Sequence, residues 1–527
     1  MMRNKNLVNR WLLAALLMML SLTFGETVIS QSATDSLKNS RHYLPKTDRQ
    51  YRYTSGYIEE NPVPEYSWAP EKAYEDFQDM KYGVRIHWGL YSIIRQEKES
   101  WPLLKKTNAE KQAYFDMYKT WNPAGFNANE WMNLFSESGM KMFAFTTKHH
   151  EGFSMFDTKT RVKKRVNYLA PGGPVIEDCD LAYSIMESPF KRDIVKELCD
   201  AAHKKDIKID LYYSHPDWYD ADFRPYVWHP LQVPSSGTLA VRGKDLAPEG
   251  AIESHFGNNG PIMAPDPSPE EVNRMMTRHR EQLKELLTNY GKIDMVCLDM
   301  WFGPSVWPQL RQTMLELRKI QPNVMFRARG IGNYGDYYTP EGFVPGSKEN
   351  SQVPWFVIYP LGRTFSYETD PSQHKGAKWI VNNIIDCAAK GGNFMVGIGP
   401  DENGKSHPTV LEQLKQAGKW LKVNGASIYA TRARESEFWK EGDSIRYTRS
   451  KDNKTIYAHC LEWPGEQLVL KTVKPKKGSK VIFMGTNVPV KWKYIEKTGI
   501  IISTPASLLN SVPEAERLAF TFKIECN

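Results

Sequence analysis

The chain has 527 residues, of which 41% are hydrophobic and 12% aromatic, and its formal net charge is +8 at pH 7. This length is more than one hydrophobic core usually serves and predicts about two domains. The lysines and arginines are scattered rather than clustered, so we do not expect the protein to bind nucleic acid.

The first 25 residues predict an export signal. Three basic residues (Arg3, Lys5 and Arg10) precede an uncharged apolar run at residues 11–24, which is too short to span a membrane comfortably. We therefore expect this segment to be removed. The mature protein should be periplasmic or extracellular, without a membrane span, and should begin with an N-terminal extension at residues 26–70.

Residues 71–434 alternate short β-branched or aromatic runs with segments of helical periodicity, the order typical of parallel βα units. The expected strands are residues 84–92, 140–147, 207–214, 295–301, 324–330, 355–364 and 394–400. The expected helices are residues 127–138, 191–204, 269–290, 304–319 and 409–423. An open doubly wound sheet fits the same alternation. Polar and aromatic residues at the carboxyl ends of the strands favour a (β/α)8-like TIM barrel, which places its active site there.

Two long connections, residues 159–189 and 219–269, follow strands and are expected to overhang the site. After residue 434 helical periodicity ends. Alternating segments at 455–461, 467–472, 480–484 and 518–524 predict a C-terminal antiparallel β-sandwich over residues 435–527.

The six cysteines show no CxxC pair and no metal-binding spacing. Cys297 and Cys387 lie in apolar stretches, so we expect them to be buried thiols rather than disulfides.

Four expected strands end in polar groups. Burying such groups is costly, which indicates that they have a functional role. The ends read Arg85-Ile86-His87-Trp88-Gly89, Lys148-His149-His150-Glu151-Gly152, Tyr212-Tyr213-Ser214 and Leu298-Asp299-Met300-Trp301. One histidine at a strand end is usually structural. Three on one barrel face, with Trp and Tyr neighbours, favour a sugar pocket, because aromatic rings stack on sugars while His and Tyr bond hydroxyls.

Other chemistries match these residues less well. His149 and His150 are adjacent on an extended segment, so their side chains are expected to point opposite ways, and the helical HExxH spacing of zinc enzymes is absent. No GxSxG motif suggests a serine hydrolase.

Asp299 interrupts an apolar strand, where an unpaired carboxylate would be expensive. If Asp299 has only a structural role, we expect it to form a salt bridge to Arg327 or Arg329 on the next strand. It is compatible with a nucleophile, which must stay ionised and gains from a nearby cation. Glu341, in the loop after that strand, would by itself pass as a surface residue.

Together these segments resemble glycoside hydrolase family 29, the α-L-fucosidases. Residues 85–91 resemble the family's F-I-H-W-G-x-Y-S segment, and residues 146–157 its T-x-K-H-H-D-G-F-x-x-W-x signature, with Glu151 for the Asp and Phe156 for the Trp. Residues 211–218 are similar to its L-Y-Y-S and D-W stretch. The similarity is greatest in residues 389–400 and 420–431, and it extends in the same order from about residue 82 to 434.

The resemblance implies a (β/α)8-like catalytic barrel over residues 71–434 with a C-terminal β-sandwich, and retention of anomeric configuration without a metal or other cofactor. It implies that Asp299 is the nucleophile. The substrate-binding residues that we expect from it and from the strand ends are His87, Trp88, Trp101, His149, His150, Tyr213, Trp301, Arg329 and Phe365. Tyr212 and Tyr213 alternate faces on a strand, and Tyr213 is the one expected to face the site.

The sequence departs from the family at the acid/base. Many members carry Trp-Glu on the sixth strand, where this chain has Trp355-Phe356. Other members have the acid/base in the loop that matches residues 339–341, which makes Glu341 the candidate here. Glu99-Ser100-Trp101 stands where Glu-Trp is usual, so Glu99 is an alternative, as is Glu368.

The expected reaction is the hydrolysis of terminal α-L-fucosyl residues from fucosylated oligosaccharides or glycoconjugates. Two alternatives remain open at the level of sequence: the same mechanism acting on an α-L-galactoside, or, because of Phe356, a carbohydrate-binding protein with impaired catalysis. The sequence makes no prediction of the oligomeric state.

Overall fold

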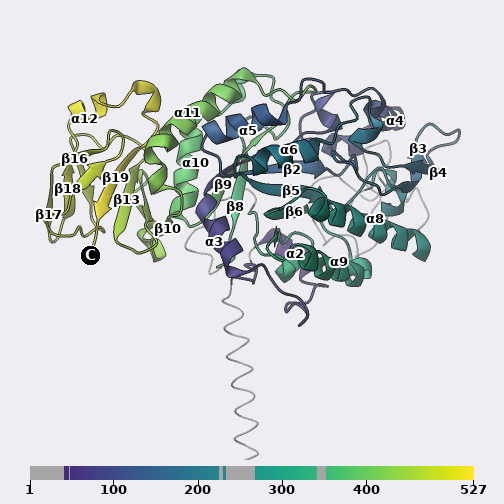
Figure 1. Cartoon of the computed structure of the whole chain (residues 1–527), viewed down its shortest axis with the longest axis horizontal. Helices are drawn as coiled ribbons and strands as arrows, with labels where there is room; N and C mark the ends of the chain where they lie inside the picture. The colour runs from purple at the N-terminus through teal and green to yellow at the C-terminus, as the bar shows by residue number, and fades with distance from the viewer. Residues whose placement is uncertain (1–40, 47, 225–228, 233–266, 341–351) are drawn as a thin grey trace, which may run out of the picture.

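The computed structural model describes residues 41–46, 48–224, 229–232, 267–340 and 352–527. The expected signal peptide at residues 1–25 and the candidate acid/base Glu341 lie outside these ranges. Figure 1 shows a larger α/β body and, beside it, a smaller β-rich body formed by the C-terminal part of the chain. No helix among the described residues is both long and apolar enough to cross a membrane.

Seven parallel strands form the curled sheet of the larger body, in the order β7-β6-β5-β2-β1-β9-β8. In chain order they are β1 (Tyr82–Ile86), β2 (Met142–Lys148), β5 (Lys208–Ser214), β6 (Met295–Asp299), β7 (Met325–Phe326), β8 (Phe356–Pro360) and β9 (Asn393–Ile398). Each overlaps one of the seven expected strands, which confirms that part of the prediction.

Tyr337 and Tyr338 bridge the two edges of this sheet. Ala328 N donates to Tyr337 O (2.9 Å), and Tyr338 N donates to Pro354 O (3.0 Å). Parallel bridges pair Arg327 with Tyr337 and Tyr338 with Trp355. The short segment therefore occupies the position between β7 and β8 and completes the barrel-like arrangement that the sequence predicted.

Helices cover the outside of the sheet (Figure 1). They are α3 (Glu71–Met80), α4 (Asn108–Asp116), α5 (Ala128–Glu137), α6 (Ile194–His203), α8 (Pro269–Thr288), α9 (Trp307–Ile320), α10 (Ala377–Ala389) and α11 (Pro408–Asn424). All five expected helices are present, whereas α3, α4 and α10 were not predicted. The N-terminal end of α8 is set by its sequence: Ser268 caps it reciprocally with Glu271, and Pro269 stands at its first position.

The strands are buried on both faces, as parallel barrel strands are. Every residue of β1, β2, β6 and β9 is buried. The charged residues among them, such as Arg85 in β1, therefore point either into the barrel or toward the helices, and each needs a partner.

The connection at residues 159–189 forms a hairpin of β3 (Val162–Asn167) and β4 (Val175–Leu181) that projects from the body (Figure 1). It was expected to overhang the site, but none of its residues lines the cavity described below. That expectation is wrong because the hairpin pairs with itself, through ion pairs such as Arg165–Glu177 (2.7 Å).

Residues 41–70, expected to be an extension, pack against the barrel and include α2 (Arg49–Thr54). The Tyr53 ring lies 4.6 Å from that of Trp301, and Tyr57 Oη donates to Phe302 O (2.5 Å). This segment consequently supplies part of the wall around the carboxyl end of β6.

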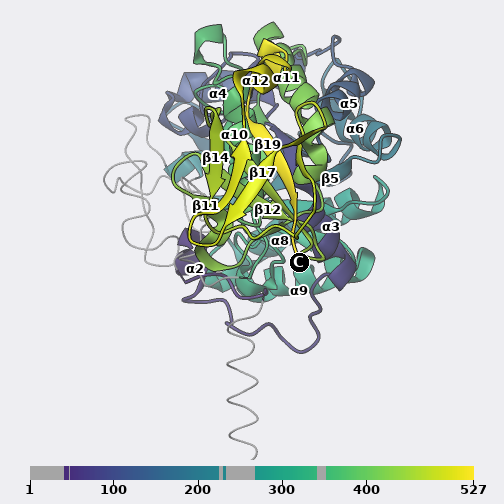
Figure 2. The same cartoon turned by 90° about the vertical axis from the view of Figure 1, so that its left-hand side faces the viewer.

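The smaller body contains two antiparallel sheets, seen in Figure 2 with this body toward the viewer. One comprises β10 (Arg432–Ala433), β11 (Lys440–Glu441), β12 (Ile445–Arg449), β13 (Thr455–Cys460), β15 (Val481–Phe483), β16 (Val488–Val490) and β19 (Phe520–Glu525). The other comprises β14 (Gln467–Leu470), β17 (Trp492–Ile495) and β18 (Gly499–Ser503), and a short helix, α12 (Ala506–Asn510), follows it. Side chains from both sheets share one core, as in a β-sandwich.

The six cysteines are all free, and Cys297 and Cys387 are buried, as expected.

Candidate active site

A cavity of about 770 Å³ opens at the carboxyl ends of the barrel strands, where this fold places its active sites. Side chains from β1, β5, β6 and β8 and from the loops that follow strands line it. The residues are Tyr53, Arg85, His87, Lys98, Glu99, Trp101, Pro102, Lys105, His149, His150, Tyr212, Asp299, Met300, Trp301, Arg327, Arg329, Thr339, Pro340, Ile358, Tyr359, Pro360 and Phe365.

Asp299 is the last residue of β6 and lies in this cavity with 8% of its surface exposed. Its Oδ1 accepts from Arg329 NH1 (2.7 Å) and Arg327 NH1 (3.2 Å). Its Oδ2 accepts from Tyr212 Oη (2.7 Å) and lies 4.0 Å from His150 Nε2. The expected salt bridge to Arg327 or Arg329 is thus confirmed, and both arginines take part.

These contacts keep the carboxylate charged. Burial alone would raise the pKa of Asp299, but Arg329 and Arg327, followed by His150 and the Tyr212 hydroxyl, hold that pKa well below its usual range. The next residue, Met300, adopts a left-handed backbone (φ 65°) that turns the chain away from the strand. Asp299 is therefore an ionised carboxylate fixed at the mouth of the barrel.

The histidine pair is arranged differently from the sequence expectation. Strand β2 ends at Lys148, so the alternation of side chains stops before His149 and His150. Both line the cavity, with ring centroids 4.1 Å apart, and the prediction that they point opposite ways is wrong. His149 Nδ1 lies 2.5 Å from Ser100 Oγ, and His150 Nδ1 lies 2.7 Å from Ser214 Oγ.

Burial lowers the pKa of His150 and of His87 well below the usual value for histidine, with His149 adding to the effect on His150 and Arg85 to that on His87. His87 stacks on Phe365 at 4.7 Å. Neutral imidazoles beside an aromatic ring can bond sugar hydroxyls without repelling one another.

Tyr212, rather than Tyr213, points into the cavity. Tyr212 bonds Asp299, whereas Tyr213 Oη donates to Gln282 Oε1 of α8 (2.8 Å) on the other side of the strand. The expectation for Tyr213 is wrong. A register shift in the pairing of β2 with β5, between Thr146 and Lys148, accompanies this arrangement, and sequence periodicity does not reveal such bulges.

Trp88 also lies away from the cavity. Its indole Nε1 donates to Asp401 O (2.8 Å), and its ring packs among those of Trp121, Phe126 and Trp131. Its expected role in binding substrate is therefore not supported, because the ring belongs to the core outside the barrel. The other expected binding residues that do line the cavity are His87, Trp101, His149, His150, Trp301, Arg329 and Phe365.

Two family models match the chain: "Alpha-L-fucosidase" over residues 58–426 and "Alpha-L-fucosidase C-terminal domain" over residues 440–525. The chain belongs to the α-L-fucosidase family. It is accordingly a glycoside hydrolase.

Individual α-L-fucosidases resemble the chain along most of its length. The human plasma α-L-fucosidase is 27% identical over 461 residues, which cover 83% of this chain and 87% of the human protein. The structure of α-L-fucosidase isoenzyme 1 from Paenibacillus thiaminolyticus superposes with a TM-score of 0.67 at 22% identity, covering 87% of this chain and 99% of that one. A GH29 α-L-fucosidase from Bacteroides thetaiotaomicron, described as a trapped covalent intermediate with 2-fluoro-fucosyl fluoride, has a TM-score of 0.64 at 22% identity, covering 88% and 99%.

Three carboxyl groups are candidates for the acid/base of this α-L-fucosidase family member: Glu341, Glu99 and Glu368. Glu341 lies outside the described residues, although Thr339 and Pro340, directly before it, line the cavity. Glu99 lines the cavity, and burial raises its pKa. Glu368 accepts from Arg363 Nε (2.8 Å) and NH2 (2.9 Å), which lowers its pKa to about 2. A group with so low a pKa is a poor proton donor, and Glu368 does not line the cavity.

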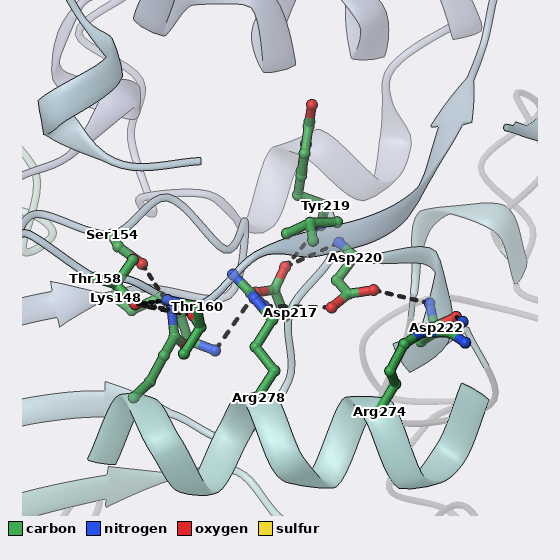
Figure 3. Close-up of polar contacts among 12 residues, drawn as sticks. Lys148, Ser154, Thr158, Thr160, Asp217, Tyr219, Asp220, Asp222, Arg274 and Arg278 are labelled. Carbon is green, nitrogen blue, oxygen red and sulfur yellow. Dashed lines mark hydrogen bonds and ion pairs between the residues drawn. The ribbon is translucent and has the colours of Figure 1, made fainter. Parts of the chain in front are cut away.

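A buried charge network lies next to the segment that carries the histidine pair, and Figure 3 shows its members Lys148, Asp217 and Arg278. Arg278, from α8, donates to Asp217 Oδ2 (2.6 Å), and Lys148 Nζ lies 3.6 Å from the same oxygen. Asp217 directly precedes Trp218, whose N donates to His150 O (2.8 Å). Sequence reasoning missed this network, because its members come from a strand end, a loop and a helix that are far apart along the chain.

The barrel floor under Asp299 is also charged. Arg85 NH2 bonds Cys297 Sγ (2.8 Å) and lies 3.6 Å from Asp210 Oδ2, while Arg327 NH1 lies 3.3 Å from the same sulfur. These contacts hold Arg327 where it can also reach Asp299. Arg85 lines the cavity, although the sequence did not predict a binding role for it.

Proposed function

We propose that the protein is a retaining exo-α-L-fucosidase that releases terminal α-L-fucosyl residues from glycans by double displacement. The observation that carries this proposal is the ionised carboxylate of Asp299, held by two guanidinium groups and a tyrosine hydroxyl in a cavity lined by histidines and aromatic rings. The covalent intermediate named for the related B. thetaiotaomicron enzyme agrees with it.

In the first step Asp299 attacks the anomeric carbon while the acid/base protonates the departing oxygen. The same acid/base then deprotonates the water that cleaves the fucosyl–Asp299 bond. We assign this role to Glu341. Glu99 is the competing candidate, since its raised pKa suits a proton donor.

The sugar would be held by hydrogen bonds from the histidines and Arg329 and by stacking on aromatic rings. We assign binding to His87, Trp101, His149, His150, Tyr212, Trp301, Arg329 and Phe365. Phe365 and Trp301 can supply the apolar contact that the methyl group of a 6-deoxy sugar requires. Burial in such a cavity suits a terminal residue, which supports exo-action.

We also propose that the protein is exported to the periplasm or beyond the cell, on the basis of the basic start and the apolar run of residues 11–24. Fucosylated oligosaccharides and glycoconjugates outside the cytoplasm would then be its substrates.

Trapping the intermediate tests the mechanism. We expect 2-fluoro-fucosyl fluoride to inactivate the enzyme and to add one 2-fluorofucosyl mass to the peptide that contains Asp299, detected by mass spectrometry. Asp299→Gly should lower kcat/KM for an aryl α-L-fucoside by at least about a thousandfold, because no ester can form. Label on another residue, or near-normal turnover by the variant, would refute the assignment.

A further inference from the structure

The segment between β1 and α4 supplies one wall of the cavity. Lys98, Glu99, Trp101, Pro102 and Lys105 from this segment all line it. Lys98 and Lys105 are exposed, whereas Glu99 is buried. The wall thus combines an aromatic ring and a proline, which can support a sugar, with two solvated ammonium groups.

The backbone of this wall is held in a specific conformation. Lys98 and Glu99 are consecutive non-glycine residues in the left-handed region (φ 64° and 53°), which is unfavourable unless other contacts hold it. Three hydrogen bonds do so: Glu99 N to Ser366 Oγ (3.0 Å), Gln96 Nε2 to Glu99 O (2.7 Å) and Trp101 N to Lys98 O (3.1 Å). The position of Lys98 at the cavity is therefore built into the fold.

Other charged side chains in the same segment have partners. Arg95 pairs with Glu402 (3.1 Å), and Glu97 pairs with Arg363 (3.0 Å). For the ammonium groups of Lys98 and Lys105, by contrast, the part of the chain that the structure describes provides neither an ion pair nor a hydrogen bond. The two lysines that line the cavity are thus available to a ligand.

The charges along the cavity wall are unequal. Five cationic side chains and two carboxyl groups occur among the described lining residues. Arg329 and Arg327 bond Asp299, and Arg85 lies beside Asp210, so these three already have carboxylate partners. The excess positive charge comes from Lys98 and Lys105. A fucosyl residue has no charge, so an anion that pairs with these lysines would belong to the group to which fucose is attached.

We propose that Lys98 and Lys105 bind an anionic group, a sulfate ester or a carboxylate, on the aglycone, so that the enzyme prefers α-L-fucosyl residues linked to acidic sugars. This inference rests on the proposed function, because it takes the end of the cavity at Asp299 as the fucose site. The lysines determine specificity through charge pairing at a solvated rim, which favours the anionic aglycone over a neutral one.

The test compares three fucosides: α-L-fucosyl-N-acetylglucosamine, its 6-O-sulfated form and α-L-fucosyl-glucuronic acid. In the two anionic fucosides the charge is remote from the scissile oxygen, which limits its effect on leaving-group reactivity. At low salt we expect kcat/KM for at least one anionic substrate to exceed that for the neutral one by roughly 5- to 30-fold, mainly through KM. Added salt should reduce this ratio by screening. The anion that gives the larger ratio identifies the preferred group.

Lys98→Gln and Lys105→Gln should each lower the anionic-to-neutral ratio about fivefold. Lys106→Gln is the matched control: it removes the same charge one residue away from Lys105, at a side chain that does not line the cavity, and should leave the ratio unchanged. A wild-type ratio near one, or equal effects of all three variants, would overturn the inference while leaving fucosidase activity established. Absence of turnover of all three fucosides would instead overturn the proposed function.

Discussion

At the scale of single residues, the chemistry depends on how Asp299 keeps its charge inside a buried cavity. Desolvation opposes ionisation, and two guanidinium groups outweigh it. Arg327 also contacts Cys297 Sγ, which accepts a hydrogen bond from Arg85 beside Asp210. The nucleophile therefore belongs to a connected set of side chains rather than to one isolated pair. Substitutions around Asp299 should therefore alter its pKa as well as the rate.

Replacing Tyr212 by Phe tests this coupling. Loss of the hydroxyl removes a hydrogen bond to a charged acceptor, so kcat/KM should fall about 10- to 100-fold. The carboxylate would lose a stabilising donor, its pKa would rise, and the acidic limb of the pH profile of kcat/KM should move to higher pH. Tyr213→Phe is the matched control: it loses only the bond to Gln282 and should leave the acidic limb in place. Equal shifts in both variants would contradict the assignment of Tyr212.

Glu341→Ala tests the acid/base. Removing a proton donor should slow substrates with poor leaving groups by about 10²- to 10⁴-fold, and activated aryl fucosides much less. Azide should restore part of the rate by attacking the fucosyl-enzyme. Two inversions would then give the α-fucosyl azide, whereas Asp299→Gly with azide should give the β-azide after one inversion. NMR distinguishes the two products.

If Glu341→Ala slows every leaving group equally and azide has no effect, Glu99 becomes the residue to substitute.

That His149 and His150 bind no metal ion remains a prediction. In the described ranges no group of three or more His, Cys, Asp or Glu side chains could hold a metal ion. Prolonged treatment with a chelator should leave kcat/KM for an aryl fucoside unchanged. Loss of activity that added zinc restores would show that the histidines bind a metal.

At the scale of elements, buried ion pairs fix the positions of the loops after β2 and β5. Asp217 in the loop after β5 contacts both Lys148 at the end of β2 and Arg278 of α8 (Figure 3). The approach of the loops is close: a Cβ on Gly152, which has φ +88°, would lie 2.0 Å from Asp217 Oδ1. Asp217 lies between Arg278 and Lys148, and although burial opposes its ionisation, these cations lower its pKa to about 2. This carboxylate therefore contributes stability above about pH 4, and the contribution is lost as the pH falls toward 2.

Asp217→Asn should lower the free energy of unfolding by about 3–5 kcal/mol at pH 7, because two buried cations lose their common anion. Urea denaturation measures the difference. Asp180→Asn is the control: it removes a carboxylate from an exposed pair with Lys163 on the hairpin and should cost no more than about 1 kcal/mol. Equal losses of unfolding free energy in the two variants would show that the buried network stabilises the fold no more than an exposed ion pair does.

At the scale of the whole molecule, the barrel and the sandwich are joined by specific contacts. Trp420 Nε1 of α11 donates to Ala519 O (2.8 Å), and Thr448 Oγ1 of β12 donates to Ser427 O (2.6 Å). Lys451 forms ion pairs with Glu75 and Asp79 on α3. The side chain of His459 lies behind this junction, buried between Thr448 and Thr521.

Burial lowers the pKa of His459 to about 3. The unfolded chain takes up this proton near pH 6.5, so the free energy of unfolding should decrease as the pH falls from about 6.5 toward 3. His459→Gln keeps a polar side chain between the threonines but removes the titration. The loss of unfolding free energy between pH 7 and pH 5 should become smaller by about 2 kcal/mol, measured by denaturant titration.

Between pH 8 and pH 9, where the histidine is neutral in both states, the pH dependence of the variant and the wild type should coincide. An unchanged loss between pH 7 and pH 5 in the variant would show that His459 is not responsible.

The sequence by itself determined most of the order of the helices and strands and the types of side chain at the strand ends. Apolar runs, helical periodicity and motifs predicted all seven barrel strands, four of the sandwich strands (β13, β14, β15 and β19) and a carboxylate paired with arginine, because these features are local or follow from adjacent strands. It also indicated the family, which the match over residues 58–426 confirms.

Only the tertiary structure decided which side chains enter the cavity. Parallel barrel strands are buried on both faces, so hydrophobic contrast cannot distinguish Tyr212 from Tyr213, and a register shift in β2 changes the alternation. Trp88 packs in the outer core, and Tyr53 reaches the cavity from a segment nearly 250 residues before Asp299. Such placements depend on contacts between distant parts of the chain, which local patterns do not contain.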